Sequence, residues 1–432
     1  MRKARLVLAI ALAGCGRLGF QEIAGHADDG GDDGAGGDQI TLVVTSDQYL
    51  AEAAGTPIAG ATVLIERRGG IDRITTDANG KARFPAAGVL ACHAVYKSEI
   101  GWRGYTVTAP PAGSVIELGS RTASLATHGM TLTLPGNATA SSFTVRLPEH
   151  CAIPPLSGAP SLGLDYEVAC EGTTPRVIGF ALPATGAGKP DLYLDAGFVS
   201  LANGATRDIT GGYTELPTRA LQITNLPLAL DGVRAEILAR SGLDLTSLSP
   251  VPGSTIPGNP TVTLSFGVVP GGNAVRVQVT PSTPIALLAS SERIAPLATA
   301  TLPATFDASS MLPAIDSLAL DGARGLRWTG GGSGGTITVV EAIAGGVQWD
   351  MYLDPAATSV HLPDLPPDLG FPMPDSPDVV SVVKLDVPGV SRADLLPTID
   401  RRWSQWPHDA MLLPQAGSSI ARILYSAALG PP

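Results

Sequence analysis

The chain has 432 residues, enough for roughly three domains of about 100–150 residues each. Hydrophobic residues make up 44% and charged residues only 16%, which excludes a largely disordered chain. The net charge of −11 argues against a nucleic-acid partner, which would require clustered Lys and Arg. The chain also holds 51 Gly and 37 Pro, and such a density of turn formers with so little charge predicts an all-β protein.

Residues 1–14 have the features of a secretory signal peptide. Basic residues near the start precede an apolar segment, residues 6–12, that is too short to span a bilayer. Leu-Ala-Gly then stands directly before Cys15, which resembles the lipobox of bacterial lipoproteins. The resemblance implies that Cys15 is acylated, becomes the new N-terminus and makes the lipid bilayer a partner. Because Gly16 follows rather than Asp, it also implies the outer membrane, on its periplasmic side or at the cell surface. The alternative is a plain signal peptide with a chance Cys.

Residues 15–39 are expected to form the lipidated Cys and a disordered Asp/Gly-rich tether. Within them, residues 27–38 alternate acids with Gly and have no hydrophobic periodicity. The acids come in adjacent pairs, which does not match the D-x-D-x-D-G calcium loop. A flexible, self-repelling linker is therefore the preferred interpretation.

Residues 40–119 change to the period-two alternation of β-strands. The stretch includes P-I-A-G-A-T-V from Pro57, T-D-A-N-G-K from Thr76 and F-P-A-A-G from Phe84. These features resemble carboxypeptidase regulatory-like (transthyretin-like) domains and related bacterial Ig-like repeats. The resemblance implies a seven-stranded β-sandwich without catalytic residues. Within it, Asn79-Gly80 predicts a tight hairpin turn.

The rest of the chain shows short strands separated by turn signals, which predicts further tandem β-sandwiches. We expect a second β-sandwich, a β-rich region and a C-terminal β-sandwich with a Pro-rich connection, at residues 120–225, 226–310 and 311–432. Three antiparallel hairpins are expected, pairing residues 130–134 with 143–147, 262–266 with 275–279, and 336–340 with 347–353. The Pro-rich connection, residues 363–377, holds six prolines and predicts an extended polyproline-like segment. Residues 391–399 are a candidate helix.

The sequence shows none of the common short motifs for catalysis, metal binding or nucleotide binding. The six His stand far apart, and there is no H-E-x-x-H, C-x-x-C or P-loop, so we expect no metal site, no cofactor and no enzyme. Residues 331–335 fit G-x-S-x-G, but they connect two expected strands, whereas a nucleophile elbow leads from a strand into a helix. Asp191 and Asp195 share a strand face and would bind Ca²⁺ only with oxygen ligands from elsewhere, so a solvated face is preferred.

Aromatic side chains are the candidate ligand platform. Trp349 with Tyr352, and Trp403 with Trp406, could stack on sugar rings if they lie exposed on a sheet. The competing interpretation places each ring in a core, because aromatics make up only 5% of the chain.

With Cys15 assigned to the lipid, three cysteines remain. Cysteines of an exported protein pair in an oxidising compartment, so one of the three is expected to be left over. We expect a Cys151–Cys170 disulfide, because both residues follow strand-like runs in the same module and flank a Pro/Gly-rich stretch. Cys92 is then a buried thiol. In the alternative, Cys92 bridges to one of the other two and locks two modules together.

Together these observations favour a non-catalytic cell-envelope lipoprotein of tandem β-sandwiches with a binding or structural role. A second hypothesis is a carbohydrate-binding or adhesive surface protein, and a third is an enzyme whose site is assembled from scattered residues. The candidate partners beyond the bilayer are polysaccharide or another envelope protein.

Overall fold

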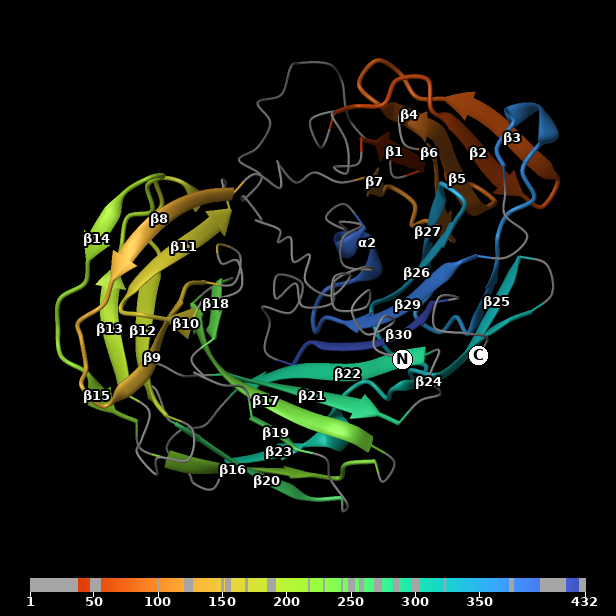
Figure 1. Cartoon of the computed structure of the whole chain (residues 1–432). Helices are drawn as coiled ribbons and strands as arrows, with labels where there is room; N and C mark the ends of the chain where they lie inside the picture. Colours follow the sequence, from red (N-terminus) through yellow and green to blue (C-terminus); the bar gives the residue numbers. More distant parts are fainter. Residues whose placement is uncertain are drawn as a thin grey trace.

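The computed structural model is all-β, as predicted, with strands numbered to β30, and its described residues include two 3₁₀ turns and one short helix (Figure 1). The structure describes residues 38–46, 56–98, 101–119, 127–148, 151, 157–167, 170–184, 192–216, 218–227, 230–241, 244–247, 253–255, 260–267, 274–282, 287–296, 304–321, 324–372, 377–396 and 417–426. In these ranges no helix is long and apolar enough to cross a membrane.

The first sandwich has the seven strands expected for residues 40–119. Its smaller sheet has the order β4-β1-β7, and its larger one has the order β3-β2-β5-β6. The strands are β1 (Gln39–Val44), β2 (Thr62–Arg67), β3 (Gly70–Thr75), β4 (Lys81–Pro85), β5 (Val89–Ser98), β6 (Gly101–Thr108) and β7 (Val115–Leu118). Alternate residues of both sheets meet in one core, which contains Leu42, Val63 and Val107.

The second sandwich pairs a five-stranded sheet, β10-β9-β12-β13-β15, with a three-stranded sheet, β11-β8-β14. Its core holds Leu132, Val145 and Val177. The strands are β8 (Thr127–Thr133), β9 (Ala140–Arg146), β10 (Ser157–Gly158), β11 (Ser161–Glu167), β12 (Arg176–Pro183), β13 (Leu192–Phe198), β14 (Thr206–Asp208) and β15 (Thr214–Glu215).

The third sandwich starts with β16 (Thr218–Thr224), which pairs with β20 and β23 rather than with the second sandwich. Strand pairing therefore divides the chain just before Thr218. The other strands are β17 (Leu230–Ser241), β18 (Asp244–Ser247), β19 (Gly253–Thr255), β20 (Val262–Gly267), β21 (Ala274–Pro281), β22 (Leu287–Pro296) and β23 (Ala304–Asp307). Ile223, Val233 and Val277 lie in its core.

The C-terminal sandwich packs the sheet β24-β25-β28 against β30-β29-β26-β27 around Trp328, Val340 and Ile423. The strands are β24 (Ile315–Leu320), β25 (Gly325–Gly330), β26 (Ile337–Ala344), β27 (Val347–Leu353), β28 (Ser359–His361), β29 (Val379–Asp386) and β30 (Ser419–Ser426). The candidate helix is present as α2 (Arg392–Leu395), capped by Ser391. Its expected end, Ile399, lies outside the described residues.

One 13-stranded sheet runs through three of the four sandwiches. Its order is β18-β17-β21-β22-β30-β29-β26-β27-β6-β5-β2-β3, with β19 beside β17. The third sandwich joins the C-terminal one through β22 and β30, and the C-terminal one joins the first through parallel pairing of β27 with β6. The first and last sandwiches are therefore neighbours in space (Figure 1).

Three of the expected hairpin contacts are wrong. β8 and β9 lie in different sheets, as do β20 and β21, and the Asn79-Gly80 turn leads from β3 in the large sheet to β4 in the small one. Gly80 has φ +69°, and a Cβ there would lie 2.4 Å from the Val44 carbonyl oxygen, so the turn needs glycine for a close approach to β1. The pair β26–β27 forms the expected antiparallel hairpin.

A candidate binding seam between the first and last sandwiches

The seam is defined here as the parallel β6–β27 pair and the side chains on either face of it. Residues 102–107 of β6 lie in register with residues 347–352 of β27. The Trp102 amide donates to the Gly346 carbonyl at 3.0 Å at one end of the pair. At Gly104, an added Cβ would lie 2.0 Å from a ring carbon of Trp349. The indole therefore lies against bare backbone, which only glycine permits.

A hydrogen-bonded chain crosses the seam on the side of the C-terminal core. Trp349 Nε1 donates to Thr106 Oγ1 at 2.8 Å, and Thr106 Oγ1 lies 2.9 Å from His93 Nδ1. With the indole as donor, we assign the threonine hydroxyl as the donor to Nδ1, which leaves the ring proton on Nε2, 3.6 Å from Glu66 Oε2. Burial lowers the pKa of His93, while Glu66 opposes that shift, so the imidazole is neutral near pH 7.

The opposite face of the seam holds buried polar groups. Arg103, Glu341, Gln348 and Asp350 are all less than 7% exposed. The Gln348 side-chain amide donates to Glu341, and Glu341 lies directly across from Asp350 in the β26–β27 register. Burial and the neighbouring Glu341 charge raise the pKa of Asp350 well above its ordinary value. Burial therefore favours the protonated form of the Asp350 carboxyl.

Arg392 of α2 links the C-terminal ends of both seam strands. Its guanidinium donates to the carbonyls of Thr108 and Ala109 at 2.6 and 3.1 Å, and to the Tyr352 carbonyl at 2.8 Å. Carbonyl groups at strand ends have no ladder partner, so a fork of donors satisfies several at once.

The Pro-rich connection forms a strap over the seam, defined here as residues 362–371. It contains the 3₁₀ turn η3 (Pro367–Leu369), so this part of the connection is not the extended polyproline-like segment that the prolines predicted. The Phe371 ring lies edge-on to both Trp102 and Trp349, with centroids 5.1 and 5.2 Å away. Asp368 forms an ion pair with Arg73 of β3, and Figure 1 shows η3 beside that strand.

The predicted aromatic platform is not present in the described structure. Trp349 and Tyr352 are each 1% exposed and, three residues apart on β27, point to opposite faces, Trp349 into the C-terminal core and Tyr352 into the first. Both are core residues, which is the competing interpretation of the sequence. Trp403 and Trp406 lie outside the described residues.

In the described ranges, no group of three or more His, Cys, Asp or Glu is placed to hold a metal ion. The loop of residues 331–335 joins β25 to β26, so its serine lies between two strands. Asp195 accepts from Arg176 Nη2 at 2.6 Å, and this hydrogen bonding lowers the pKa of Asp195. Asp191 lies outside the described residues, as does Cys15.

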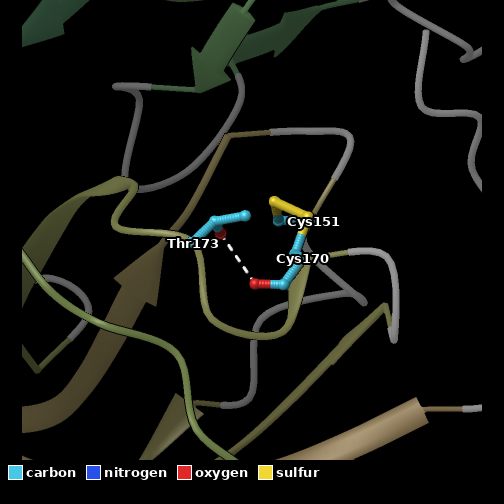
Figure 2. The surroundings of a disulfide bond; sticks show 3 residues. All are labelled: Cys151, Cys170 and Thr173. Atoms are coloured by element: carbon cyan, nitrogen blue, oxygen red, sulfur yellow. Dashed lines mark hydrogen bonds between the residues drawn. A yellow bond between two sulfur atoms is a disulfide. The ribbon is translucent and has the colours of Figure 1, made fainter. Parts of the chain in front are cut away.

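The Cys151–Cys170 disulfide is confirmed, with Cα atoms 5.7 Å apart, and lies in the core of the second sandwich (Figure 2). Thr173 Oγ1 donates to the Cys170 carbonyl at 2.7 Å. Next to the bridge, Glu171 accepts hydrogen bonds from Tyr166 and from the Asn203 amide, and it lies 2.8 Å from His128 Nδ1. The bridged loop is thereby tied to β8 and β11. Cys92 is a free, buried cysteine, as expected.

Sequence reasoning missed the seam. Its local signal is the alternation of Gln348 and Asp350 with apolar residues in one strand, and a single Glu341 in the otherwise apolar strand beside it. Such alternation usually predicts that the polar side chains face solvent. In this sheet both faces are covered, so the polar side chains are buried instead.

No protein-family profile matches the chain, and no curated protein matches its sequence. Among solved structures, it is similar to the Bacillus anthracis TIE protein at 9% identity and a TM-score of 0.15, over 57% of this chain and 45% of that one. This chain thus spans less than half the length of that protein. A Ca²⁺-stabilized adhesin, described as helping an Antarctic bacterium to bind ice, matches at 12% identity and a TM-score of 0.15, over 82% and 95% of the two chains. A Streptococcal ancillary pilin matches at 9% identity and a TM-score of 0.14, over 62% and 98%. Similarity at this level carries no argument about activity or partners.

Proposed function

We propose that this protein is a non-catalytic, exported lipoprotein, anchored through acylated Cys15 in the outer membrane of a bacterium, whose sandwiches serve a binding or structural role. The Cys151–Cys170 disulfide is the observation that carries the export step, because such bridges persist in oxidising compartments. It agrees with the leader and lipobox at residues 1–15. We also propose that the unit spanning β1 to β7 is a carboxypeptidase regulatory-like sandwich.

The proposed structural role is supported by the way the sandwiches are joined. Tandem modules linked only by loops move relative to one another by default. Here three sandwiches share one hydrogen-bonded sheet, and Arg392, Phe371 and Trp349 connect the last sandwich to the first. Such a body presents fixed surfaces rather than a flexible string of modules.

Acylation is tested with Cys15→Ala, expressed beside the unaltered protein in a Gram-negative host. The unaltered chain should incorporate labelled palmitate and fractionate with outer membranes, whereas the variant should accumulate as an unprocessed precursor. Cys92→Ala is the matched control, because it removes a cysteine without touching the lipobox. Normal processing and localisation of Cys15→Ala would show that the lipobox interpretation is wrong.

The binding role is tested separately from the anchor. A glycan array probed with the detergent-solubilised protein should give no signal that depends on Trp349 or Tyr352, because both side chains are buried. Saturable glycan binding would replace this proposal with the carbohydrate-binding hypothesis.

A further inference from the structure

One end of the first sandwich, the entry end, is the end at which β1 begins. Gln39 of β1 lies opposite Pro85, the last residue of β4. Thr41 lies opposite Val115, the first residue of β7. The same end holds the loops of residues 68–69, 86–88 and 109–114, which join β2 to β3, β4 to β5 and β6 to β7. Three loops therefore share one end of the sandwich with the point at which the chain enters it.

The entry end exposes apolar side chains. Five large hydrophobic side chains are exposed in the described ranges, and three of them lie at this end: Ile71, Leu90 and Val115, with exposed fractions of 49%, 44% and 41%. The loops nearest to Leu90 and Val115 read A-A-G at residues 86–88 and A-P-P-A-G-S at residues 109–114, without a charged residue. Large apolar side chains that are exposed together, rather than singly, mark an interaction surface.

The opposite end of the same sandwich is polar. The turn from β3 to β4 lies there, because Thr75 pairs with Thr62 and Lys81 pairs with Val43. This turn has the sequence D-A-N-G-K at residues 77–81. Its aspartate carboxylate accepts hydrogen bonds from two backbone N–H groups of the turn, at 2.8 and 2.9 Å. The sandwich thus differs between its two ends, with an apolar entry end and a polar far end.

The entry point is hydrogen-bonded to both apolar loops. The Ala86 amide donates to the Asp38 carbonyl at 2.7 Å, and the Gly113 amide donates to the Gln39 carbonyl at 2.9 Å. Gln39 follows Cys15, the proposed acylation site, by 24 residues. A Gly-rich chain of that length has a root-mean-square end-to-end distance of about 25–30 Å. An acyl anchor on Cys15 therefore holds the entry end, rather than the polar end, nearest to the lipid surface.

One exposed cation accompanies the apolar side chains. Arg67 is used within the protein, because it pairs with Asp72 at 2.9 Å. Its guanidinium also donates to the carbonyls of Pro85 and Ala87, which fixes the β4–β5 loop. The adjacent Arg68 is exposed in the connection from β2 to β3. A guanidinium next to exposed apolar groups can bind a lipid phosphate while those groups enter the headgroup region.

We propose that the entry end of the first sandwich is a membrane-contact surface, whose loops insert shallowly into the headgroup region of the leaflet that holds the acyl chains. The anchor keeps this surface at a high effective concentration near the leaflet, so a contact too weak to capture a free protein is still occupied. The acyl chains set the distance, and the loops set the orientation of the sandwiches relative to the bilayer. The inference deepens the structural role proposed above and rests on acylation of Cys15.

The test places a fluorescent probe at each end of the first sandwich. The full chain is reconstituted into vesicles of phosphatidylethanolamine and phosphatidylglycerol, with one introduced cysteine that carries an environment-sensitive dye. In Leu90→Cys the emission should shift to the blue on reconstitution. Spin-labelled lipid should quench it at least about twofold more strongly than in Asn79→Cys, the matched control at the polar end, because only the apolar end enters the headgroup region.

The same labelling reports on the anchor. The unaltered protein should take up no dye, because Cys92 is buried, Cys151 and Cys170 are bridged and Cys15 carries lipid. Labelling of Cys15 in the unaltered protein would overturn acylation and this inference with it. An unaltered protein that takes up no dye, together with equal quenching at the two ends, would overturn this inference alone.

A second pair of variants separates insertion from mere proximity to the lipid. With the dye at Val115→Cys, adding Leu90→Asp should reduce the quenching, whereas adding Asn79→Asp should leave it unchanged. Leu90 and Asn79 are both exposed, so both variants should keep the circular-dichroism spectrum of the unaltered protein. Quenching at residue 115 that survives Leu90→Asp would overturn the proposal.

Discussion

Trp349 and Thr106 are 243 residues apart in the chain, yet the indole N–H of one donates to the hydroxyl of the other at 2.8 Å in a fully buried position. Trp349 belongs to the last sandwich and Thr106 to the first. The bond therefore directly joins the last sandwich to the first across the seam.

Removing both partners of this bond should cost less than the sum of the losses from removing each alone. Thr106→Val leaves the indole N–H buried without a partner, which should lower the free energy of unfolding by about 1–3 kcal/mol. In Thr106→Val/Trp349→Phe no indole donor remains, so the loss should fall short of the sum of the two single losses. A double-mutant cycle by urea unfolding measures the difference, and strictly additive losses would contradict a direct bond.

Gly104→Ala should destabilise the seam, because the new Cβ would lie 2.0 Å from the rigid Trp349 ring. Overpacking of this kind costs typically about 1–3 kcal/mol. Gly163→Ala is the matched control on β11, where nothing lies within 4 Å of the new methyl group. Thermal unfolding of the two variants should separate them clearly. Similar melting temperatures would mean that the Trp349 ring moves aside freely.

The cysteines should react in two distinct ways. Without reductant, Cys151 and Cys170 should resist alkylation even in denaturant, whereas Cys92 should alkylate only after unfolding, because burial raises the pKa of its thiol to about 12. Cys151→Ser/Cys170→Ser should lose roughly 3 kcal/mol of stability through the unfolded state. Peptide mapping by mass spectrometry checks the reactivity. Rapid alkylation of Cys92 in the native protein would contradict its burial.

Asp350 should make stability fall as the pH rises. Its pKa is raised in the folded state, so the folded protein holds a proton that the unfolded chain releases above about pH 4. The stabilisation is complete below the unfolded pKa and is lost as the pH rises toward the folded pKa, by up to about 1.4 kcal/mol per pH unit. Asp350→Asn should flatten this part of the profile above about pH 4.

Asp195 serves as a control, because its contribution to stability changes with pH in the opposite direction. Hydrogen bonds from Arg176 lower its pKa, so its contribution is present above the unfolded pKa and is lost as the pH falls. Asp195→Asn should therefore change the acid side of the profile and leave the slope near neutrality intact. An Asp350→Asn profile parallel to that of the unaltered protein would show that Asp350 does not titrate as described.

Local features of the sequence predicted much of the fold. Period-two alternation marked most strands of the first sandwich, and cysteine parity with a Pro/Gly-rich loop gave the Cys151–Cys170 bridge. Both rest on residues near one another in the chain. The hairpin predictions at residues 130–147 and 262–279 failed because the same turn residues serve a hairpin and a crossing between two sheets.

The seam lay beyond local reasoning. The partner of β6 is 245 residues away, from Trp102 to Val347, and nothing in either strand encodes that choice. The strap was predicted as an extended Pro-rich connection, yet its contact with Trp102 and Arg73 depends on the completed fold. Side-chain pattern fixes which residues are buried, whereas partner choice is decided by how whole sandwiches meet.

The parallel pairing of β6 with β27 also sets an order of events during synthesis. Strand β6 is made early, and its outer hydrogen-bonding edge has no partner until residues 347–353 have been added. A chain interrupted before that point carries an open strand edge, and open edges pair with other chains. Premature termination upstream of Val347 should therefore yield self-associating fragments, whereas the finished chain seals the same edge within itself.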